Sequence, residues 1–301
     1  MTYKTFDEIE QSVLNQDNKK VIALCGAHDS HSLDAVLEAK KKGLCDCVLI
    51  GYTDKITDLL KQRNEDPSDY RIIESEEVDC SKVAVELIHN GEADIPMKGL
   101  MQTSDFMRPI LNKETGLIEQ DNVLSQVTVM EYPKEDRFIL ITDSAINISP
   151  DLQRKKQIID NAVKLAIKLG IECPKVAAIS ALEVVNPKMI STVEADELTK
   201  MNKNGEIKDC IVSGPLAFDN AISAEAASHK GIDDPVAGHA DIILVPEIVT
   251  GNVLTKTLIF FTDLKLAGTF VGTKCPIIAA SRSDSPENKF RSILIGLFLA
   301  H

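Results

Sequence analysis

An α/β fold built mainly on parallel sheets is predicted by two observations. Short apolar runs alternate with helix-like stretches along the whole chain, which is typical of strands covered by helices. The strand-like runs also contain few polar residues, as expected for strands that are buried on both faces. A length of 301 residues allows two domains.

The first part of the chain shows this alternation clearly. In order, we expect a strand at 21–25, a helix at 32–42, a strand at 45–51, a helix at 54–62, a strand at 71–73, a helix at 80–89 and a strand at 93–97. Gly43 closes the first of these helices, since glycine adopts the conformation that ends a helix. Cys45 and Cys47 lie two apart on a strand and therefore share a face.

The second part begins with two strands, 123–130 and 138–142, joined through 132–137. A long helix is then expected from Ser149-Pro150 to Leu169, closed by Gly170. Further strands are expected at 176–179, 210–213, 241–245 and 272–280. We place one domain at 1–142 plus 281–301, which makes it discontinuous, and the other at 143–280.

The C-terminal segment contains the strongest candidate site. An apolar run ends at Ser281-Arg282, and Ser285-Pro286 has the residues of a helix N-cap and first helical position. A hydroxyl, a guanidinium and helix N–H groups then lie within a few residues. Such groups bind phosphoryl groups and oxyanions.

A second candidate site follows the strand-like run that ends at Lys98-Gly99. Thr103 or Ser104 can cap a helix that carries Arg108 about one turn further on. Ligands bind beyond the carboxyl ends of parallel strands, so these side chains can reach a ligand. A capped helix with a surface arginine explains the same residues.

Asp219 and Lys256 mark two more loops at strand ends. Asp219 follows the strand breaker Gly214-Pro215 and can act as an acceptor or base, or simply as an N-cap worth about 1 kcal/mol. Gly251 allows a close backbone approach beside Asn252, and Lys256 lies one turn further along a helix. A solvated lysine is the alternative for Lys256.

Asp143 and Ser144 form a polar loop after the strand that ends at Thr142. Their position near the expected domain junction suits the wall of a ligand cleft. A simple turn explains the loop equally well.

Composition excludes several classes of function. The formal net charge of −13 disfavours sequence-independent nucleic-acid binding. No apolar run approaches the roughly 18 residues of a membrane span, and the N-terminus has no signal-peptide pattern. The seven cysteines are scattered and predict reduced thiols in a cytoplasmic protein. His28 and His31 have no third ligand nearby, so no metal site is expected.

Several motifs in order resemble the phosphate acetyl/butyryltransferase family. The resemblance rests on Lys98-Gly99, the run 103–109, Gly214–Asn220, Pro246–Asn252 and Ser281-Arg282. It covers roughly residues 20–295, and its shorter phosphate butyryltransferase (phosphotransbutyrylase) branch is the most similar. The common P-loop, GxSxG and GxGxxG motifs are absent from the chain.

The resemblance implies a fold like that of isocitrate dehydrogenase, with the active site in an interdomain cleft. It implies transfer of a short acyl group between CoA and phosphate, which are substrates, with no cofactor and no metal. It also implies a homo-oligomer built on a dimer.

The same resemblance implies that Arg108 and Arg282 bind phosphate and CoA, and that Ser281 stabilises the transition state. The acetyltransferase branch has an aspartate where this chain has Asn288, and an amide cannot act as a base. We expect direct transfer in a ternary complex, because no activated nucleophile is visible in the sequence.

Three other functions stay open. A phosphate acetyltransferase or broad-chain phosphate acyltransferase shares the chemistry. A metal-dependent 2-hydroxyacid dehydrogenase shares the expected fold, but it needs a cluster of aspartates that the motifs do not supply. A CoA-thioester binding protein without activity would not need Ser281 and both arginines.

Overall fold

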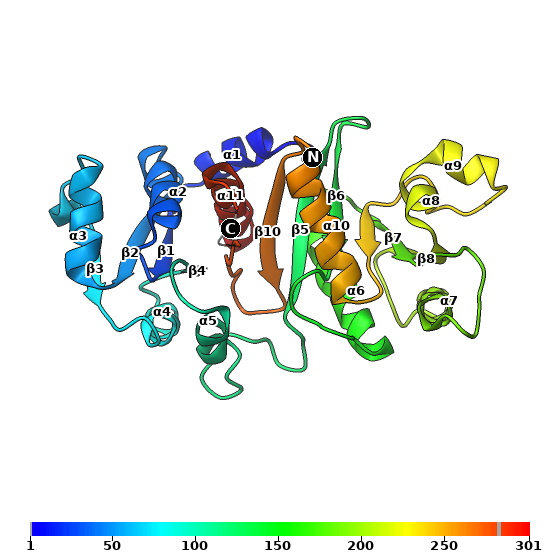
Figure 1. Cartoon of the computed structure of the whole chain (residues 1–301), viewed down its shortest axis with the longest axis horizontal. Coiled ribbons are helices and arrows are strands. Elements are labelled where there is room, and N and C mark those ends of the chain that lie inside the picture. Colours follow the sequence, from blue (N-terminus) through cyan, green and yellow to red (C-terminus); the bar gives the residue numbers. More distant parts are fainter. Residues whose placement is uncertain (1, 282–283) are drawn as a thin grey trace. The chain divides into compact units, whose positions relative to one another are not determined.

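A computed structural model describes residues 2–281 and 284–301 of the chain (Figure 1). The chain divides into two compact units. Unit one contains the residues up to Thr5 together with Val123–Leu266, and unit two contains Phe6–Asn122 and Ala267–His301. Both units are α/β, and their sheets are largely parallel, so the predicted fold class is confirmed.

Unit two contains a parallel sheet with the strand order β3-β2-β1-β4. Its elements are α1 (Phe6–Leu14), β1 (Lys20–Cys25), α2 (Ser30–Lys41), β2 (Cys45–Gly51), α3 (Thr53–Gln62), a 3₁₀ turn (Pro67–Asp69), β3 (Arg71–Glu74), α4 (Cys80–His89), β4 (Ile95–Lys98), α5 (Thr103–Ile110) and α11 (Pro286–Ala300). The strands are apolar and almost fully buried in β1, β2 and β4, as helices on both faces require.

Helices α1 and α2 of unit two each pack on α11, and α4 packs on α5. Figure 1 shows the first group above the strands and the second group below them. The C-terminal helix α11 therefore belongs to the same unit as the N-terminal strands, although the long segment Val123–Leu266 of unit one separates them in sequence.

Unit one contains the strand order β5-β6-β9-β7-β8. Its elements are β5 (Ser125–Tyr132), β6 (Arg137–Thr142), α6 (Leu152–Lys168), β7 (Lys175–Ile179), α7 (Ile190–Lys203), β8 (Ile211–Leu216), α8 (Phe218–Ile222), α9 (Ala224–His229), β9 (Ile242–Leu244) and α10 (Ile248–Phe261). Strand β10 (Leu266–Val271) begins at the last residue of this unit. Strands β5 and β6 are antiparallel, and the pairs β6–β9, β9–β7 and β7–β8 are parallel.

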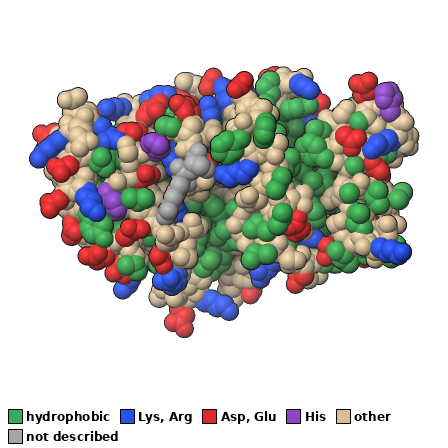
Figure 2. Space-filling model, in the orientation of Figure 1, with side chains coloured by type: hydrophobic (Ala, Val, Ile, Leu, Met, Phe, Trp, Pro, Cys, Tyr) green, Lys and Arg blue, Asp and Glu red, His purple; other side chains and the backbone are tan. Residues whose placement is uncertain are grey.

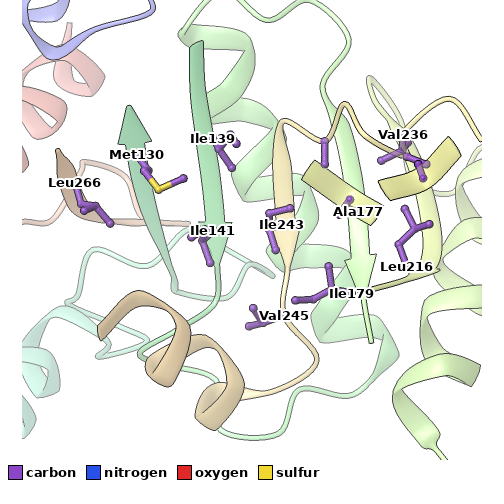
Figure 3. Close-up of a cluster of buried hydrophobic side chains, with 14 residues drawn as sticks. Met130, Ile139, Ile141, Ala177, Ile179, Leu216, Val236, Ile243, Val245 and Leu266 are labelled. Atoms are coloured by element: carbon purple, nitrogen blue, oxygen red, sulfur yellow. The ribbon is translucent and has the colours of Figure 1, made fainter. Parts of the chain in front are cut away.

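One buried apolar cluster organises a face of the unit-one sheet. Figure 3 shows side chains of β6, β9 and β7, among them Ile141, Ile243 and Ile179, pointing into this cluster. Leu254 and Leu258 of α10 pack against it from outside the sheet. Burial of such side chains stabilises the unit by about 1.5–3 kcal/mol each.

The junctions between units lie at 5/6, 122/123 and 266/267, whereas the sequence suggested 142/143 and 280/281 for the domains. The antiparallel pairing of β5 with β6 is one physical reason, because it keeps both strands in one unit. The long helix α6 begins at Leu152 with Asp151 as its N-cap, so the expected start at Ser149-Pro150 was wrong.

The strand expected at 272–280 was also placed wrongly. The regular strand β10 lies earlier, and the later segment forms isolated bridges, such as the parallel bridge between Ile278 and Met97. Glycine and proline at positions 272 and 276 interrupt a regular ladder. The helix α7 was not foreseen.

Candidate active site

The turn before α11 lies at the end of the apolar segment that runs beside β4. The backbone N–H of Lys98 donates to the carbonyl oxygen of Ile278 at 2.8 Å. The backbone N–H of Ile278 donates to the carbonyl oxygen of Pro96 at 3.0 Å. This pairing brings Lys98 and Ser281 to the same edge of the sheet, because the bridge between Met97 and Ile278 is parallel. Lys98 is only 4% exposed.

Two glycines let the strand ends at this edge come close together. A Cβ on Gly26 would lie 2.5 Å from the carbonyl oxygen of Leu100, and a Cβ on Gly99 would lie 2.5 Å from the carbonyl oxygen of Gly26. The φ of Gly26 is +67°, a conformation that favours glycine. The backbone after β1 and β4 is therefore packed too closely for side chains at these positions.

Ser285 caps α11 as the sequence predicted. Its Oγ accepts from the N–H of Asn288 at 3.2 Å, and Pro286 is the first helical residue. The Oδ1 of Asn288 accepts from Arg291 at 2.6 Å. The Asn288 side chain is therefore held within its own helix.

Ser281 is bound on both sides of its backbone. Its N–H donates to Oδ2 of Asp284 at 2.8 Å, and its carbonyl oxygen accepts from the N–H of Asp284 at 3.1 Å and from Nζ of Lys289 at 2.9 Å. Arg282, the predicted partner of Ser281, lies outside the described residues.

Lys289 is a residue that the sequence reasoning missed. It lies in the first turn of α11 and is 2% exposed. Burial lowers the pKa of its ammonium, while the carboxylates of Asp29 and Asp284 act in the opposite direction. A lysine four residues after the N-cap, in a helix whose later turns are apolar, was the signal that could have revealed it.

Helix α5 carries the other predicted residues of unit two. Thr103 and Ser104 are exposed in its first turn, but the N-cap is Gln102 and makes no side-chain cap bond. The expected cap was therefore wrong. Arg108 has a side chain that is 68% exposed and forms an ion pair with Asp105 at 2.7 Å, since the two lie three residues apart on one helix face.

In unit one, the structure brings four predicted residues together after β6. Ser144 Oγ donates to Oε1 of Gln126 at 2.5 Å, and Nδ2 of Asn252 donates to the carbonyl oxygen of Ser144 at 3.5 Å. A Cβ on Gly251 would lie 2.9 Å from Cα and Cβ of Ser144. Gly251 is thus needed where α10 packs on this turn.

Asp143 is the buried centre of the same turn. Its carboxylate accepts from the N–H groups of Ala145, Ile146 and Asn147 at 2.9–3.2 Å and from Nδ2 of Asn147 at 2.5 Å. Burial raises the pKa of the Asp143 carboxyl, and these hydrogen bonds act in the opposite direction.

Two further predicted residues of unit one are Asp219 and Lys256. Asp219 lies inside α8, whose N-cap is Ala217, so the expected cap at Asp219 was wrong. Its carboxylate pairs with Lys230 at 3.2 Å, and Lys230 also pairs with Glu183 at 2.6 Å. Lys256 lies on α10, one turn after Asn252.

The cysteines and the possible metal ligands were candidates for chemistry outside the motifs. Cys25, Cys45, Cys47, Cys80 and Cys210 are buried and free. Over residues 2–281 and 284–301, no three His, Cys, Asp or Glu side chains gather as a metal site would require. No helix in the same ranges is long and apolar enough to span a membrane.

Comparison with known proteins places this geometry in a family. The model of the family described as "Phosphate acetyl/butaryl transferase" matches residues 53–297. A phosphate butyryltransferase of Clostridium acetobutylicum is 46% identical over 298 residues, covering 99% of this chain and 98% of the relative. A phosphate acetyltransferase of Thermotoga maritima is 41% identical and covers 93% and 95%.

Among solved structures, the chain is similar to a branched-chain phosphotransacylase from Enterococcus faecalis. The TM-score is 0.81 at 35% sequence identity, covering 94% of this chain and 99% of the other. The family model leaves out the first 52 residues, whereas these relatives and this solved structure cover more than nine tenths of the chain. The chain belongs to the phosphate acetyl/butaryl transferase family.

Proposed function

We propose that this enzyme transfers a short acyl group reversibly between CoA and inorganic phosphate, with butyryl-CoA and phosphate giving butyryl phosphate and CoA. The observation that carries the proposal is the 46% identity to a phosphate butyryltransferase along almost the full length of both chains. CoA and phosphate are substrates in this reaction, and no cofactor takes part.

The test is release of CoA from butyryl-CoA, followed with a thiol reagent in the presence and absence of phosphate. Phosphate-dependent release with formation of butyryl phosphate supports the proposal. Release that is independent of phosphate would indicate a thioesterase instead. The absence of any release would indicate a protein that binds CoA thioesters without catalysing a reaction.

A phosphate acetyltransferase is the second candidate, favoured by the 41% identity to the Thermotoga maritima relative. The two candidates differ in kcat/KM for butyryl-CoA and acetyl-CoA. Each methylene in an apolar pocket is worth about 1–3 kcal/mol. A preference for butyryl-CoA of about tenfold or more, which is about 1.4 kcal/mol, would identify the butyryl enzyme.

In the proposed mechanism, phosphate attacks the thioester carbon directly and the thiolate of CoA leaves. Ser281 donates a hydrogen bond to the oxyanion that forms at the carbonyl oxygen. Arg108 binds the phosphoryl oxygens, since a guanidinium can bind two oxygens at once, and Arg282 with the N-terminus of the final helix stabilises the thiolate of CoA. The exposed side chain of Arg108 leaves it accessible to a ligand.

The state of the buried cysteines supports transfer without an acyl-enzyme. Burial raises the pKa of Cys47 to about 11 and that of Cys210 to about 12, so their thiols stay protonated at neutral pH and are poor nucleophiles. Mass spectrometry of enzyme quenched with excess butyryl-CoA tests this. A butyryl adduct on Ser281 or on any cysteine would contradict direct transfer.

The role of Arg282 is tested by Arg282→Gln. We expect most of kcat to be lost while the far-UV circular dichroism is unchanged, because the loss removes a charge and not a core side chain. A turnover close to that of the wild type would remove Arg282 from the site.

We also propose that the enzyme is a cytoplasmic homo-oligomer built on a dimer. Its buried, free thiols suit a reducing compartment.

Helix α10 exposes Val249, Val253, Phe260 and Phe261 at 60–85%, and Figure 2 shows hydrophobic side chains gathered over the region of α10. Exposed apolar surface of this kind favours association. Phe261→Ser should weaken the dimer in analytical ultracentrifugation, and a monomeric mass for the wild type would contradict it.

A further inference from the structure

Lys289 occupies a position that is unfavourable for an ammonium group. Lysine is almost never fully buried unless it is paired, yet Lys289 is 2% exposed. It also lies in the first turn of α11, where the helix dipole is positive and disfavours a cation. A side chain held at such a place is a candidate for a role beyond packing.

The contact that holds Lys289 is with the proposed catalytic turn. Nζ donates to the carbonyl oxygen of Ser281 at 2.9 Å across eight residues of sequence. The N–H of Asp284 donates to the same oxygen at 3.1 Å, and the carboxylate of Asp284 accepts from the N–H of Ser281 at 2.8 Å. Lys289 and Asp284 therefore hold the Ser281 peptide groups from both sides.

Charged groups lie on the elements that pack on α11, and two of them, Asp29 and Asp284, act on Lys289. Asp284 precedes the helix, and Asp29 lies in the loop between β1 and α2. Lys98 ends β4. Further along α11, Nζ of Lys42, the C-cap of α2, lies 4.6 Å from the ring centre of Phe290 and pairs with Glu10 of α1 at 3.0 Å.

Asp29 and Asp284 favour the charged form of Lys289, while burial disfavours it and lowers the pKa of the ammonium. The carboxylate of Asp29 is already shared with the N–H of Ser32 at 3.1 Å, as the N-cap of α2. Burial therefore outweighs the two carboxylates in its effect on the pKa of Lys289.

We propose that Lys289 is a positioning residue for the acyl transfer: it fixes the Ser281 carbonyl and places positive charge behind Ser281, where the oxyanion forms. The inference rests on the proposed function. It requires no covalent step and no change in the protonation of Lys289 during turnover. Its consequence is that the protonated form of Lys289 is the active form.

The decisive variants are Lys289→Met, which keeps the length of the side chain without its charge, and Lys289→Arg, which keeps the charge. The exposed Lys82 of α4 provides the control Lys82→Met. The assay runs from acyl-CoA and phosphate, because no thiol has to ionise in that direction, and it measures kcat, both KM values and the pH profile.

For Lys289→Met we expect kcat to fall about 10- to 100-fold, since small displacements of a catalytic group have effects of this size, with KM values changed less than about threefold. Lys289→Arg should restore most of kcat. As pH rises, wild-type activity should fall with a midpoint below the usual lysine pKa of about 10.4. In Lys289→Arg this midpoint should move to higher pH, because guanidinium stays charged.

Three outcomes separate the possibilities. Wild-type kcat in Lys289→Met overturns the inference and leaves the proposed function intact. Equal losses of kcat in Lys289→Met and Lys289→Arg, with matching losses of stability and an unchanged pH profile, also overturn it. They would indicate that Lys289 contributes only to packing. A wild-type enzyme without phosphate-dependent CoA release overturns the proposed function. If Lys289→Met does not fold, the pH profiles of wild type and Lys289→Arg decide.

Discussion

The turn after β6 in unit one contains a buried ionisable side chain, whereas the turn before α11 in unit two is contacted by one from the first turn of that helix. In unit one, Asp143 binds groups of its own turn, the N–H groups of Ala145, Ile146 and Asn147. In unit two, Lys289 binds the carbonyl of Ser281, which lies eight residues away.

The difference indicates distinct roles for the two turns. A carboxylate that accepts several hydrogen bonds from its own turn stabilises that turn, and has little capacity left for a ligand. A cation that reaches back to the segment before its own helix instead orders the residues around Ser281. We therefore propose that Asp143 shapes the turn that carries Ser144 and contacts Asn252, as part of a ligand-binding surface. We propose that the acyl transfer itself takes place at Ser281.

The largest expected effect on stability is that of Asp143→Ala. Three backbone N–H groups lose their acceptor, at about 1–3 kcal/mol for each that stays buried. Because water reaches the exposed Ala145, we expect a total loss of about 2–4 kcal/mol. Urea denaturation measures it. The matched control Asp151→Ala removes an exposed N-cap of α6 and should cost about 1 kcal/mol; equal losses would refute the contrast.

Gly251→Ala should have the next largest effect. The added Cβ would lie 2.8 Å from Val245 and 2.9 Å from Ser144, and overpacking of this kind costs about 1–3 kcal/mol. The gain in helix propensity, about 1 kcal/mol, offsets only part of it. The change in urea midpoint is compared with that of Thr257→Ala, which is exposed on the same helix. A more stable Gly251→Ala would mean that α10 and the Ser144 turn are not closely packed.

The smallest effect concerns pH. The Asp143 carboxyl has a raised pKa in the folded state because of burial, so the folded state binds more protons than the unfolded state just above about pH 3.9. Its contribution to stability is complete below that pH and is lost as pH rises through the folded pKa.

The pH effect is measured as the difference in unfolding free energy between wild type and Asp143→Asn from about pH 4 to pH 6. As pH rises, the wild type should lose unfolding free energy relative to Asp143→Asn. The loss is at most about 1.4 kcal/mol for each tenfold increase that folding causes in the proton affinity of the carboxyl. A difference that grows in favour of the wild type would show that the hydrogen bonds to the carboxylate outweigh its burial.

Local signals in the sequence were enough for many elements. Ser285-Pro286 marked the start of α11 correctly, and helix α4 has the expected bounds of Cys80–His89. Thr103 and Asp219 failed as caps because each helix begins slightly earlier, at Thr103 itself and at Phe218. Propensity alone does not distinguish a cap from the first turn, where the same residues also occur.

Contacts between distant segments were out of reach. The bond from Ser144 to Gln126 depends on the pairing of β5 with β6, and the bond from Lys289 to Ser281 depends on how α11 returns to the turn. A lysine in a helix is usually solvated, so burial at position 289 follows only from tertiary packing. The family motifs in the sequence did identify the acyltransferase family correctly.

The role of Ser281 is tested by the kcat of Ser281→Ala for phosphate-dependent release of CoA from butyryl-CoA, measured beside the wild type. We expect an active wild type and a folded variant whose kcat is lower by about 10²- to 10³-fold, as for loss of an oxyanion donor. A folded Ser281→Ala enzyme with wild-type kcat would contradict it.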